Sequence, residues 1–182
     1  AYNSAYSHRV TWKFGAYSNV QTIAAGGTST SYTIPLNWLQ AIPNATSGTA
    51  SATLETLDTS GNVLGTSSYN FTITAPASVM PNLQSVSVVP VNSNSVLAGW
   101  NVYAYGKSQA KITINGAGGA YGSTIKSYSI TTDPGVGSAG ASSLTTGTLY
   151  KAGTITVTAR VTDSRGRAAT KSTTFTISPY AA

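Results

Sequence analysis

An internal repeat of one β-hairpin constrains the fold of this chain more than any other feature of its sequence. Residues 48–58 (GTASATLETLD) and residues 153–163 (GTITVTARVTD) share an opening Gly-Thr, a central Thr and a closing Asp at identical spacing. Each copy is followed by a turn-forming segment and returns through Phe-Thr-Ile, at residues 71–73 and 175–177. A supersecondary unit that is used twice is typical of tandem modules. The repeat therefore predicts two bodies of the same β-type.

The residue pattern within the repeat is that of a strand with one buried face. Along residues 154–162, apolar side chains alternate with Thr and Arg, so one face is apolar and the other is polar. The same alternation elsewhere predicts further strands, with Trp12 and Trp100 in the core. These strands are expected at residues 9–14, 95–105, 109–114 and 124–130.

One segment has helical periodicity instead. Apolar residues recur at helical spacing between Pro35, which suits the first helical position, and Pro43, which ends the run. We expect a helical crossover of at most two turns that closes one end of the first core. Trp38 is expected to serve there as an anchor or as an exposed contact.

A proline-containing stretch separates the two copies of the repeat. Residues 75–83 (APASVMPNL) contain two prolines and no periodicity, which predicts a short, stiff linker between a module at residues 1–76 and a module at residues 77–182. The expected fold class is all-β, with two tandem immunoglobulin-like or fibronectin-like β-sandwich modules and one short helical turn in the first. A small β-barrel is the alternative.

The residues that carry most enzyme chemistry are scarce in this chain. Charged residues make up 8% of the 182 positions, and the sequence contains no Cys, one His and four acidic residues. Acid–base and nucleophilic mechanisms need a positioned set of such groups. The sequence therefore predicts a protein that is not an enzyme, with no catalytic residues, no metal site and no cofactor. No apolar run approaches the roughly 20 residues that cross a bilayer, so we expect no membrane insertion.

The net positive charge belongs to the second module. Residues 1–76 hold two basic and two acidic residues, whereas residues 77–182 hold eight basic and two acidic residues, which leaves all six net charges in the second module. A basic face there would suit an anionic cell-wall polymer or an acidic neighbouring subunit, and a solvated strand face is the alternative. We expect no nucleic acid partner, because the basic residues are dispersed and no recognition helix is present. The residues of this face are Lys107, Lys111, Lys126, Arg165 and Arg167.

The segment DSRGR, residues 163–167, has two interpretations. A hairpin turn explains the acid and the glycine. An anion clamp explains Arg165 and Arg167, because a guanidinium matches carboxylate or phosphate. The corresponding segment of the first copy, DTSGN at residues 58–62, contains no arginine. The turn is therefore the favoured interpretation, and it leaves the two arginines unexplained.

Three tyrosines of the second module suggest a carbohydrate contact. Aromatic rings present flat apolar faces on which sugars can stack. By alternation, Tyr103 and Tyr105 point away from Trp100, and Tyr121 follows nearby in the sequence. The alternative is that these tyrosines are ordinary strand residues at a solvated edge.

Three long segments of the chain resemble a known family. They are SYTIPLNWLQAIPNATSGTASATLETLDTSGNVLG, GKSQAKITINGAGGAYGSTIKSYSI and AGTITVTARVTDSRGRAATKSTTFTI. Together they are similar to structural proteins of long-tailed bacteriophages that infect Gram-positive bacteria, a family with tandem immunoglobulin-like modules that is catalogued as a domain of unknown function. The resemblance implies a location in the virion tail and supplies no active-site residues.

The expected function is a non-enzymatic tail or tail-tip structural protein, a spacer and attachment module that contributes to host-surface adsorption. Its expected partners are other virion tail subunits and an anionic host cell-wall polymer or glycan. We also expect the full-length protein to form a homo-oligomer. Two alternatives stand beside this one: a module that recognises host glycans, and the stalk of a bacterial surface adhesin with Lys-to-Asn cross-links.

Overall fold

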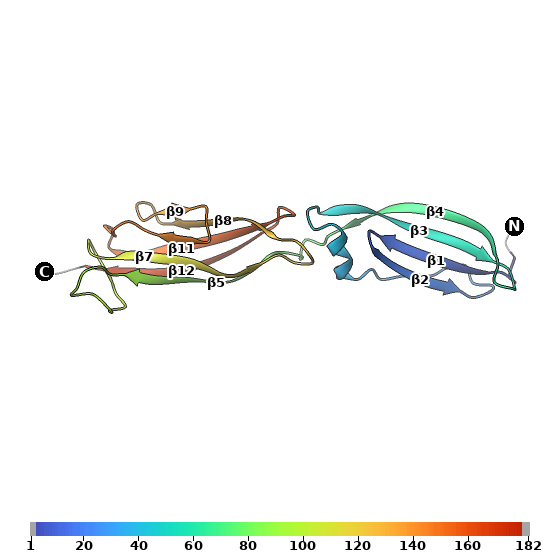
Figure 1. Ribbon diagram of the computed structural model, residues 1–182, viewed down its shortest axis with the longest axis horizontal. Coiled ribbons are helices and arrows are strands. Elements are labelled where there is room, and N and C mark those ends of the chain that lie inside the picture. The colour runs from blue at the N-terminus through green and yellow to red at the C-terminus, as the bar shows by residue number, and fades with distance from the viewer. Residues whose placement is uncertain (1–2, 180–182) are drawn as a thin grey trace. The chain divides into compact units, whose positions relative to one another are not determined.

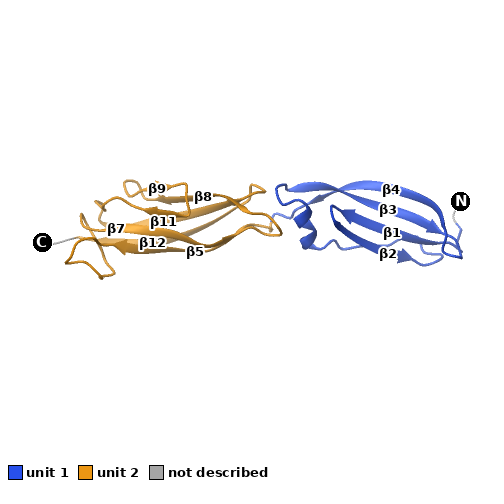
Figure 2. Cartoon of the chain, in the orientation of Figure 1, with its two compact units in different colours: residues 1–77 blue, residues 78–182 orange. Residues whose placement is uncertain are grey.

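The computed structural model describes residues 3–179 and contains two compact units, residues 1–77 and residues 78–182 (Figure 2). Within the described residues, twelve strands and one short 3-10 helix make up the regular structure (Figure 1). The expected all-β class is confirmed. The prediction of one short helical segment is confirmed as well, at Leu36–Ala41 (η1) in unit 1.

Unit 1 is built on one antiparallel sheet of four strands. The repeat forms the hairpin at one side of this sheet, and the strand predicted at residues 9–14 lies next to it. The strands are β1 (Ser7–Phe14), β2 (Tyr17–Ile23), β3 (Ser47–Leu57) and β4 (Val63–Thr74), in the spatial order β2-β1-β3-β4.

The second layer of unit 1 is the connection between β2 and β3, not a second sheet. Trp38 from η1 is 4% exposed and packs with Phe14 and Ala50. The rings of Tyr17 and Tyr32 lie 6.1 and 5.6 Å from Trp38, measured between ring centroids. Trp38 is therefore the buried anchor of η1. This arrangement differs from the two-sheet form expected for the first module, because aromatic side chains of the connection already cover the apolar face of the sheet.

Unit 2 is a sandwich of two sheets. One sheet has the order β10-β7-β5, and the other has the order β6-β12-β11-β8-β9. The strands are β5 (Asn82–Val91), β6 (Tyr103–Ala104), β7 (Gln109–Gly118), β8 (Ile125–Thr132), β9 (Ser138–Ala139), β10 (Ser143–Thr145), β11 (Gly153–Asp163) and β12 (Ala168–Ser178).

The core of unit 2 follows the alternation of the repeat. Ile155, Val157 and Val161 on β11 are fully buried, while Arg160 on the same strand is exposed. They pack in one cluster with Ile112 of β7, which belongs to the opposite sheet. The period-2 pattern thus identified the buried face correctly.

The segment at residues 95–105 does not form the strand that its alternation predicts. Only Tyr103 and Ala104 form a strand, and the residues before them form turns and irregular structure. Trp100 is 60% exposed, so its predicted place in the core is wrong. Gly99 interrupts the strand pattern with a φ of +80°, a conformation that favours glycine. Trp12, in contrast, is partly buried and packs against the core of unit 1.

The residues on either side of the unit boundary are each bound to their own unit. The Ala75 N–H donates to the Thr46 carbonyl over 2.8 Å in unit 1. In unit 2, the Arg167 guanidinium donates to the Val79 carbonyl over 3.1 Å, and Val79 is 4% exposed. The connection between these anchored residues is therefore short.

Candidate functional site

The turn at residues 163–167 is organised by its acid. The Asp163 Oδ1 atom accepts the N–H groups of Arg165 and Arg167 over 3.0 and 2.9 Å. The Asp163 N–H donates to the Arg167 carbonyl, and the Gly166 N–H donates to the Asp163 carbonyl. Gly166 has a φ of +81°. These bonds are those of a hairpin turn in which an Asp side chain binds the backbone two and four residues further on.

Unit 1 repeats this geometry atom for atom. Asp58 Oδ1 accepts the N–H groups of Ser60 and Asn62 over 2.8 Å each, and Gly61 has a φ of +84°. Hydrogen bonds from the Asn62 side chain and backbone hold the pKa of Asp58 below its ordinary value. The shared turn explains why the acid and the glycine recur in both copies.

The arginines of the second turn bind the protein's own backbone. Arg165 is 6% exposed and donates to the carbonyls of Ala120 and Tyr121 over 2.5 and 2.6 Å. Asp163 is completely buried, and its Oδ2 accepts the Ser123 hydroxyl over 3.0 Å. The Arg165 side chain therefore holds the loop between β7 and β8 against the turn. This geometry supports a structural role and leaves Arg165 poorly placed as an open anion contact.

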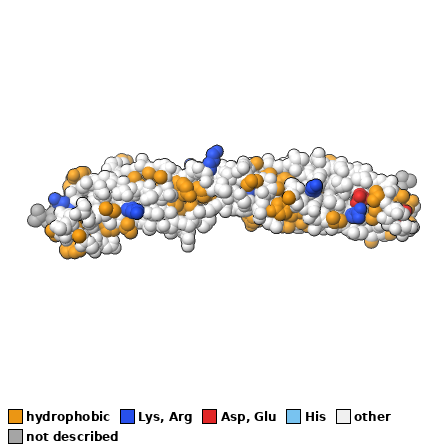
Figure 3. Space-filling model, viewed as in Figure 1, with side chains coloured by type: hydrophobic (Ala, Val, Ile, Leu, Met, Phe, Trp, Pro, Cys, Tyr) orange, Lys and Arg blue, Asp and Glu red, His pale blue; other side chains and the backbone are white. Residues whose placement is uncertain are grey.

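The other basic residues do not form one face. Lys111 lies on β7, between buried Ala110 and Ile112, so its side chain points outward from the three-stranded sheet. Lys126 lies on β8, in the five-stranded sheet, and Lys107 lies in the turn after β6. Basic side chains are few and lie apart from one another on the face drawn in Figure 3.

The three tyrosines of the expected glycan contact are not brought together. Tyr103 is partly buried, its ring centroid lies 4.6 Å from that of Phe175, and burial raises its pKa. Tyr105 is bound through its N–H to the carbonyl of Ser178, at the end of β12. Tyr121 lies beside Arg165, near the start of β12. The structure thus places Tyr105 and Tyr121 at opposite ends of unit 2.

A different group of aromatic side chains is exposed where β12 ends. We call it the aromatic end of unit 2 and define it as Trp100, Tyr105 and Tyr150, which are 60%, 42% and 69% exposed. The rings of Tyr105 and Tyr150 are 5.9 Å apart in an edge-to-face arrangement. The Gly106 N–H donates to the Leu149 carbonyl, which joins the two loops that carry these tyrosines.

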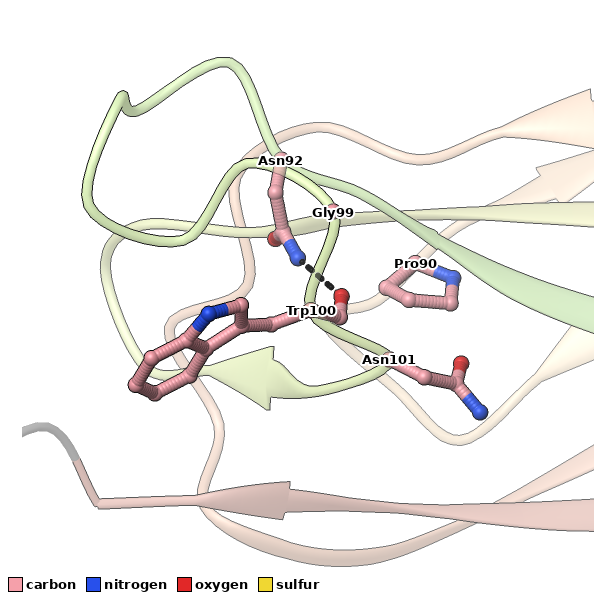
Figure 4. A pocket seen from close by; sticks show the side chains of 5 residues that line it. All are labelled: Pro90, Asn92, Gly99, Trp100 and Asn101. Carbon is pink, nitrogen blue, oxygen red and sulfur yellow. Dashed lines mark hydrogen bonds between the residues drawn. The ribbon is translucent and has the colours of Figure 1, made fainter.

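The loop that carries Trp100 is held by a polar network. The Asn92 amide donates to the Trp100 carbonyl over 3.0 Å (Figure 4). It also donates to the Val102 carbonyl over 3.2 Å, and its oxygen accepts the Ser108 hydroxyl over 2.5 Å. Ser108 is completely buried and also accepts the Ala104 N–H. These bonds satisfy backbone groups of a loop that pairs with no neighbouring strand, and the indole of this loop is exposed to solvent.

An open hollow of about 360 Å³ lies beside Trp100, and Figure 4 shows its lining. Sequence reasoning missed this end because it assigned Trp100 to the core and did not single out Tyr150. The available signal was the turn-type composition around the indole, with glycine before it and asparagine after it. The lining residues are Pro90, Asn92, Gly99, Trp100 and Asn101.

Each acid of the chain has a local partner. Glu55 accepts the Arg9 side chain over 2.6 Å, and this hydrogen bond lowers the pKa of Glu55. Asp133 accepts the Thr156 N–H over 3.1 Å and lies 3.9 Å from the Lys151 ammonium. Between residues 3 and 179, no group of three or more His, Cys, Asp or Glu side chains is arranged to hold a metal ion. The same residues include no helix with the length and apolar character needed to span a membrane.

These features define a two-unit all-β protein with an exposed aromatic end. The family model described as "Siphovirus protein of unknown function (DUF859)" matches residues 2–181, and the chain belongs to this family. The resemblance to a siphophage family of unknown function is thus confirmed. No curated protein matches the chain.

Among solved structures, the chain is similar to the fibronectin(III)-like modules of Clostridium thermocellum CbhA. The identity is 14%, the TM-score is 0.39, and the match covers 94% of this chain and 78% of that chain. At this identity and TM-score, the likeness says nothing about function.

Proposed function

We propose that the chain is a non-enzymatic structural protein of the siphovirus particle, a spacer and attachment module in the tail or tail tip. The observation that carries this proposal is the presence of two separately packed β-units whose boundary residues are each anchored to their own unit. A short anchored connection keeps modules at a limited distance, whereas a long flexible tether would not. Family membership supports a role in the virus particle.

The partners of the acidic side chains support the non-enzymatic part of the proposal. Asp58 and Asp163 organise turns, Glu55 pairs with Arg9, and Asp133 binds the backbone N–H of Thr156. A general acid or base must reach a substrate proton. Carboxylates that bind backbone N–H groups or a neighbouring arginine are explained by folding alone.

The aromatic end supports the attachment part. Trp100, Tyr105 and Tyr150 expose ring faces that can stack on sugars, and Lys107 lies in the adjoining turn. Unit 2 also carries all six net positive charges of the chain. We propose that this end contacts host cell-wall glycan or an anionic wall polymer. A dedicated carbohydrate-binding module is the second candidate, and the same three rings favour it.

The adhesin-stalk alternative gains no support from the lysines. A Lys-to-Asn cross-link needs a neutral amine as nucleophile, and burial favours the neutral form. All six lysines are exposed. We expect the intact mass of the chain to equal that of its sequence, whereas a loss of one ammonia per cross-link would revive this alternative.

Two experiments test the proposal. Antibodies to the chain should label the tails of purified virions, and proteomics should detect it in those particles; absence from particles contradicts the structural role.

For attachment, purified host wall glycan is titrated with the full chain. The pair Trp100→Ala and Tyr150→Ala should weaken binding about tenfold or more.

The matched control for the titration is Tyr121→Ala, which removes an exposed ring at the other end of unit 2 and should leave binding unchanged. Titration at several salt concentrations separates the two ligand classes, because phosphate-type contacts weaken steeply with salt whereas ring stacking does not. Equal losses in the control and in the paired variant would exclude the aromatic end as the contact.

A further inference from the structure

The outer edge of β4 is open. Within residues 3–179 no strand lies beyond β4 in the sheet of unit 1, and Figure 1 shows it at the side of that sheet. The strand is twelve residues long, and its residues 63–70 are exposed on both faces. A long edge strand presents a row of unpaired backbone donors and acceptors to any chain that can pair with it.

β4 lacks the residues with which proteins usually protect such an edge. Its sequence, VLGTSSYNFTIT, contains no charged residue and no proline. Lysine, proline and very short edge strands are the common protections against pairing with another chain. None of these three occurs along β4, and the one irregularity in its pairing is a bulge at its start, opposite Thr56 and Leu57.

Unit 2 of the same chain carries these protections. Its edge strands β6 and β9 are two residues long, and β10 is three residues long. The fourth edge strand, β5, contains Pro90, and the Lys171 ammonium binds the carbonyl of Gln84 over 2.6 Å. The other edge strand of unit 1, β2, also lacks charge and proline but has seven residues, so β4 is the longer of the two unprotected edges of unit 1.

The direction of the backbone identifies the groups that would pair. The Ala75 N–H donates to Thr46 across the hairpin, so the backbone groups of Ala75 point toward β3. In an antiparallel ladder, the N–H and C=O of one residue point to the same side, and successive residues alternate. The groups that point away from β3 therefore belong to Thr66, Ser68, Asn70, Thr72 and Thr74.

We propose that β4 pairs antiparallel with β4 of a second copy of this chain. A two-fold axis places residue i opposite residue j and residue j opposite residue i, so a charge near the axis would lie close to the same charge of the second copy. A strand with no charge in twelve residues avoids this repulsion. Unit 1 also has no net charge, whereas two copies of unit 2 would meet with six positive charges each.

Exposed apolar side chains beside this edge fit the same pairing. Tyr69 is 73% exposed and lies opposite Ala52 in the ladder, on the face that also carries Leu54, which is 39% exposed. A strand added outside β4 would bring its own side chains against the Tyr69 ring. The four-stranded sheets of unit 1 in the two copies would then form one continuous sheet.

The test uses the full chain in sedimentation velocity over a wide concentration range, together with amide hydrogen exchange. We expect a monomer–dimer equilibrium and slower exchange of the Ser68 and Asn70 amides as dimer accumulates. The variant with Ser68→Lys and Asn70→Lys brings four added positive charges to the paired edge and should shift the dissociation constant upward at least about tenfold. Both positions are exposed, so the fold should be retained, as circular dichroism would verify.

The matched control is Thr174→Lys, which adds a charge at an exposed position of β12, in the other unit of the chain. It should dimerise like the unmodified chain. The proposal is overturned by a chain that stays monomeric throughout, by a dimer whose Ser68 and Asn70 amides exchange as fast as in the monomer, or by a lysine variant that dimerises as well as the control. A virion strand from another protein as the true occupant would give the first of these results.

Discussion

At the scale of single residues, the opening glycine of the repeat serves different purposes in its two copies. A Cβ at Gly48 would lie 2.7 Å from Ile42 Cγ2 and 3.0 Å from Phe14 Cε2, so close packing requires glycine there. Gly153 has open space around it but a φ of +99°. Glycine at this aligned position is thus required by packing in unit 1 and by backbone conformation in unit 2.

We expect Gly48→Ala to destabilise unit 1 by about 1–3 kcal/mol through overpacking, and Gly153→Ala to destabilise unit 2 by about 1 kcal/mol through its backbone. Urea unfolding of both variants measures these values. Adding Ile42→Ala should offset part of the loss from Gly48→Ala and none of the loss from Gly153→Ala. If Ile42→Ala offset the loss of stability equally in the Gly48→Ala and Gly153→Ala variants, the packing explanation would be wrong.

The two turn acids should differ in their importance. Asp163→Ala leaves the N–H groups of Arg165 and Arg167 without their acceptor in a buried site, and we expect a loss of about 2–4 kcal/mol. Asp58→Ala exposes its donors to water and should be much milder. Denaturant unfolding of the two variants tests this order. If Asp58→Ala destabilised the chain more than Asp163→Ala, burial of the turn would not explain the loss of stability.

Asp58 also makes the stability of unit 1 depend on pH. Hydrogen bonds from Asn62 lower the pKa of this carboxyl in the folded state. Its contribution is therefore present above the unfolded pKa, near about 4, and is lost as the pH falls through the folded value. Thermal unfolding between neutral and acidic pH should show this loss, and Asp58→Asn should flatten the dependence.

At the scale of elements, the hairpins could be predicted from sequence because their signals are local. Alternation fixed the buried face of β11, and an Asp followed by a Gly three residues later identified both turns. Trp100 was misplaced because the alternation of residues 95–105 was followed without regard to the side chains that hold the loop from outside this segment, Asn92 and Ser108. The burial of Arg165 likewise depends on a loop more than 40 residues earlier, which no local pattern reveals.

The loop that bears Trp100 should loosen when its polar network is cut. Asn92→Ala removes the donor to the Trp100 and Val102 carbonyls, and we expect a loss of about 1–3 kcal/mol in the stability of unit 2.

Acrylamide quenching measures the exposure of the Trp100 indole, because Trp38 is buried and Trp12 is partly buried. Trp100→Phe should remove most of the quenchable fluorescence. Unchanged quenching in that variant would contradict the exposed position.

At the scale of the whole molecule, the two units have separate cores. The cluster around Phe14 and Trp38 belongs to unit 1, and the cluster around Ile112 and Val157 belongs to unit 2. A fragment of residues 78–182 should therefore fold alone, with Val79 still held by its arginine. Circular dichroism and a cooperative thermal transition measure this. A fragment without cooperative unfolding would show that the units depend on each other.

The strand order gives each unit a particular response to mechanical tension. In unit 1, β1 begins opposite the end of β3, at Leu57, whereas β4 finishes opposite the start of β3, at Ser47. In unit 2, β12 begins beside the segment that precedes β5 and finishes a strand length away. A force applied to the two ends of either unit therefore acts parallel to the strands. Under such a shear force, many inter-strand hydrogen bonds must break at the same time, instead of one after another.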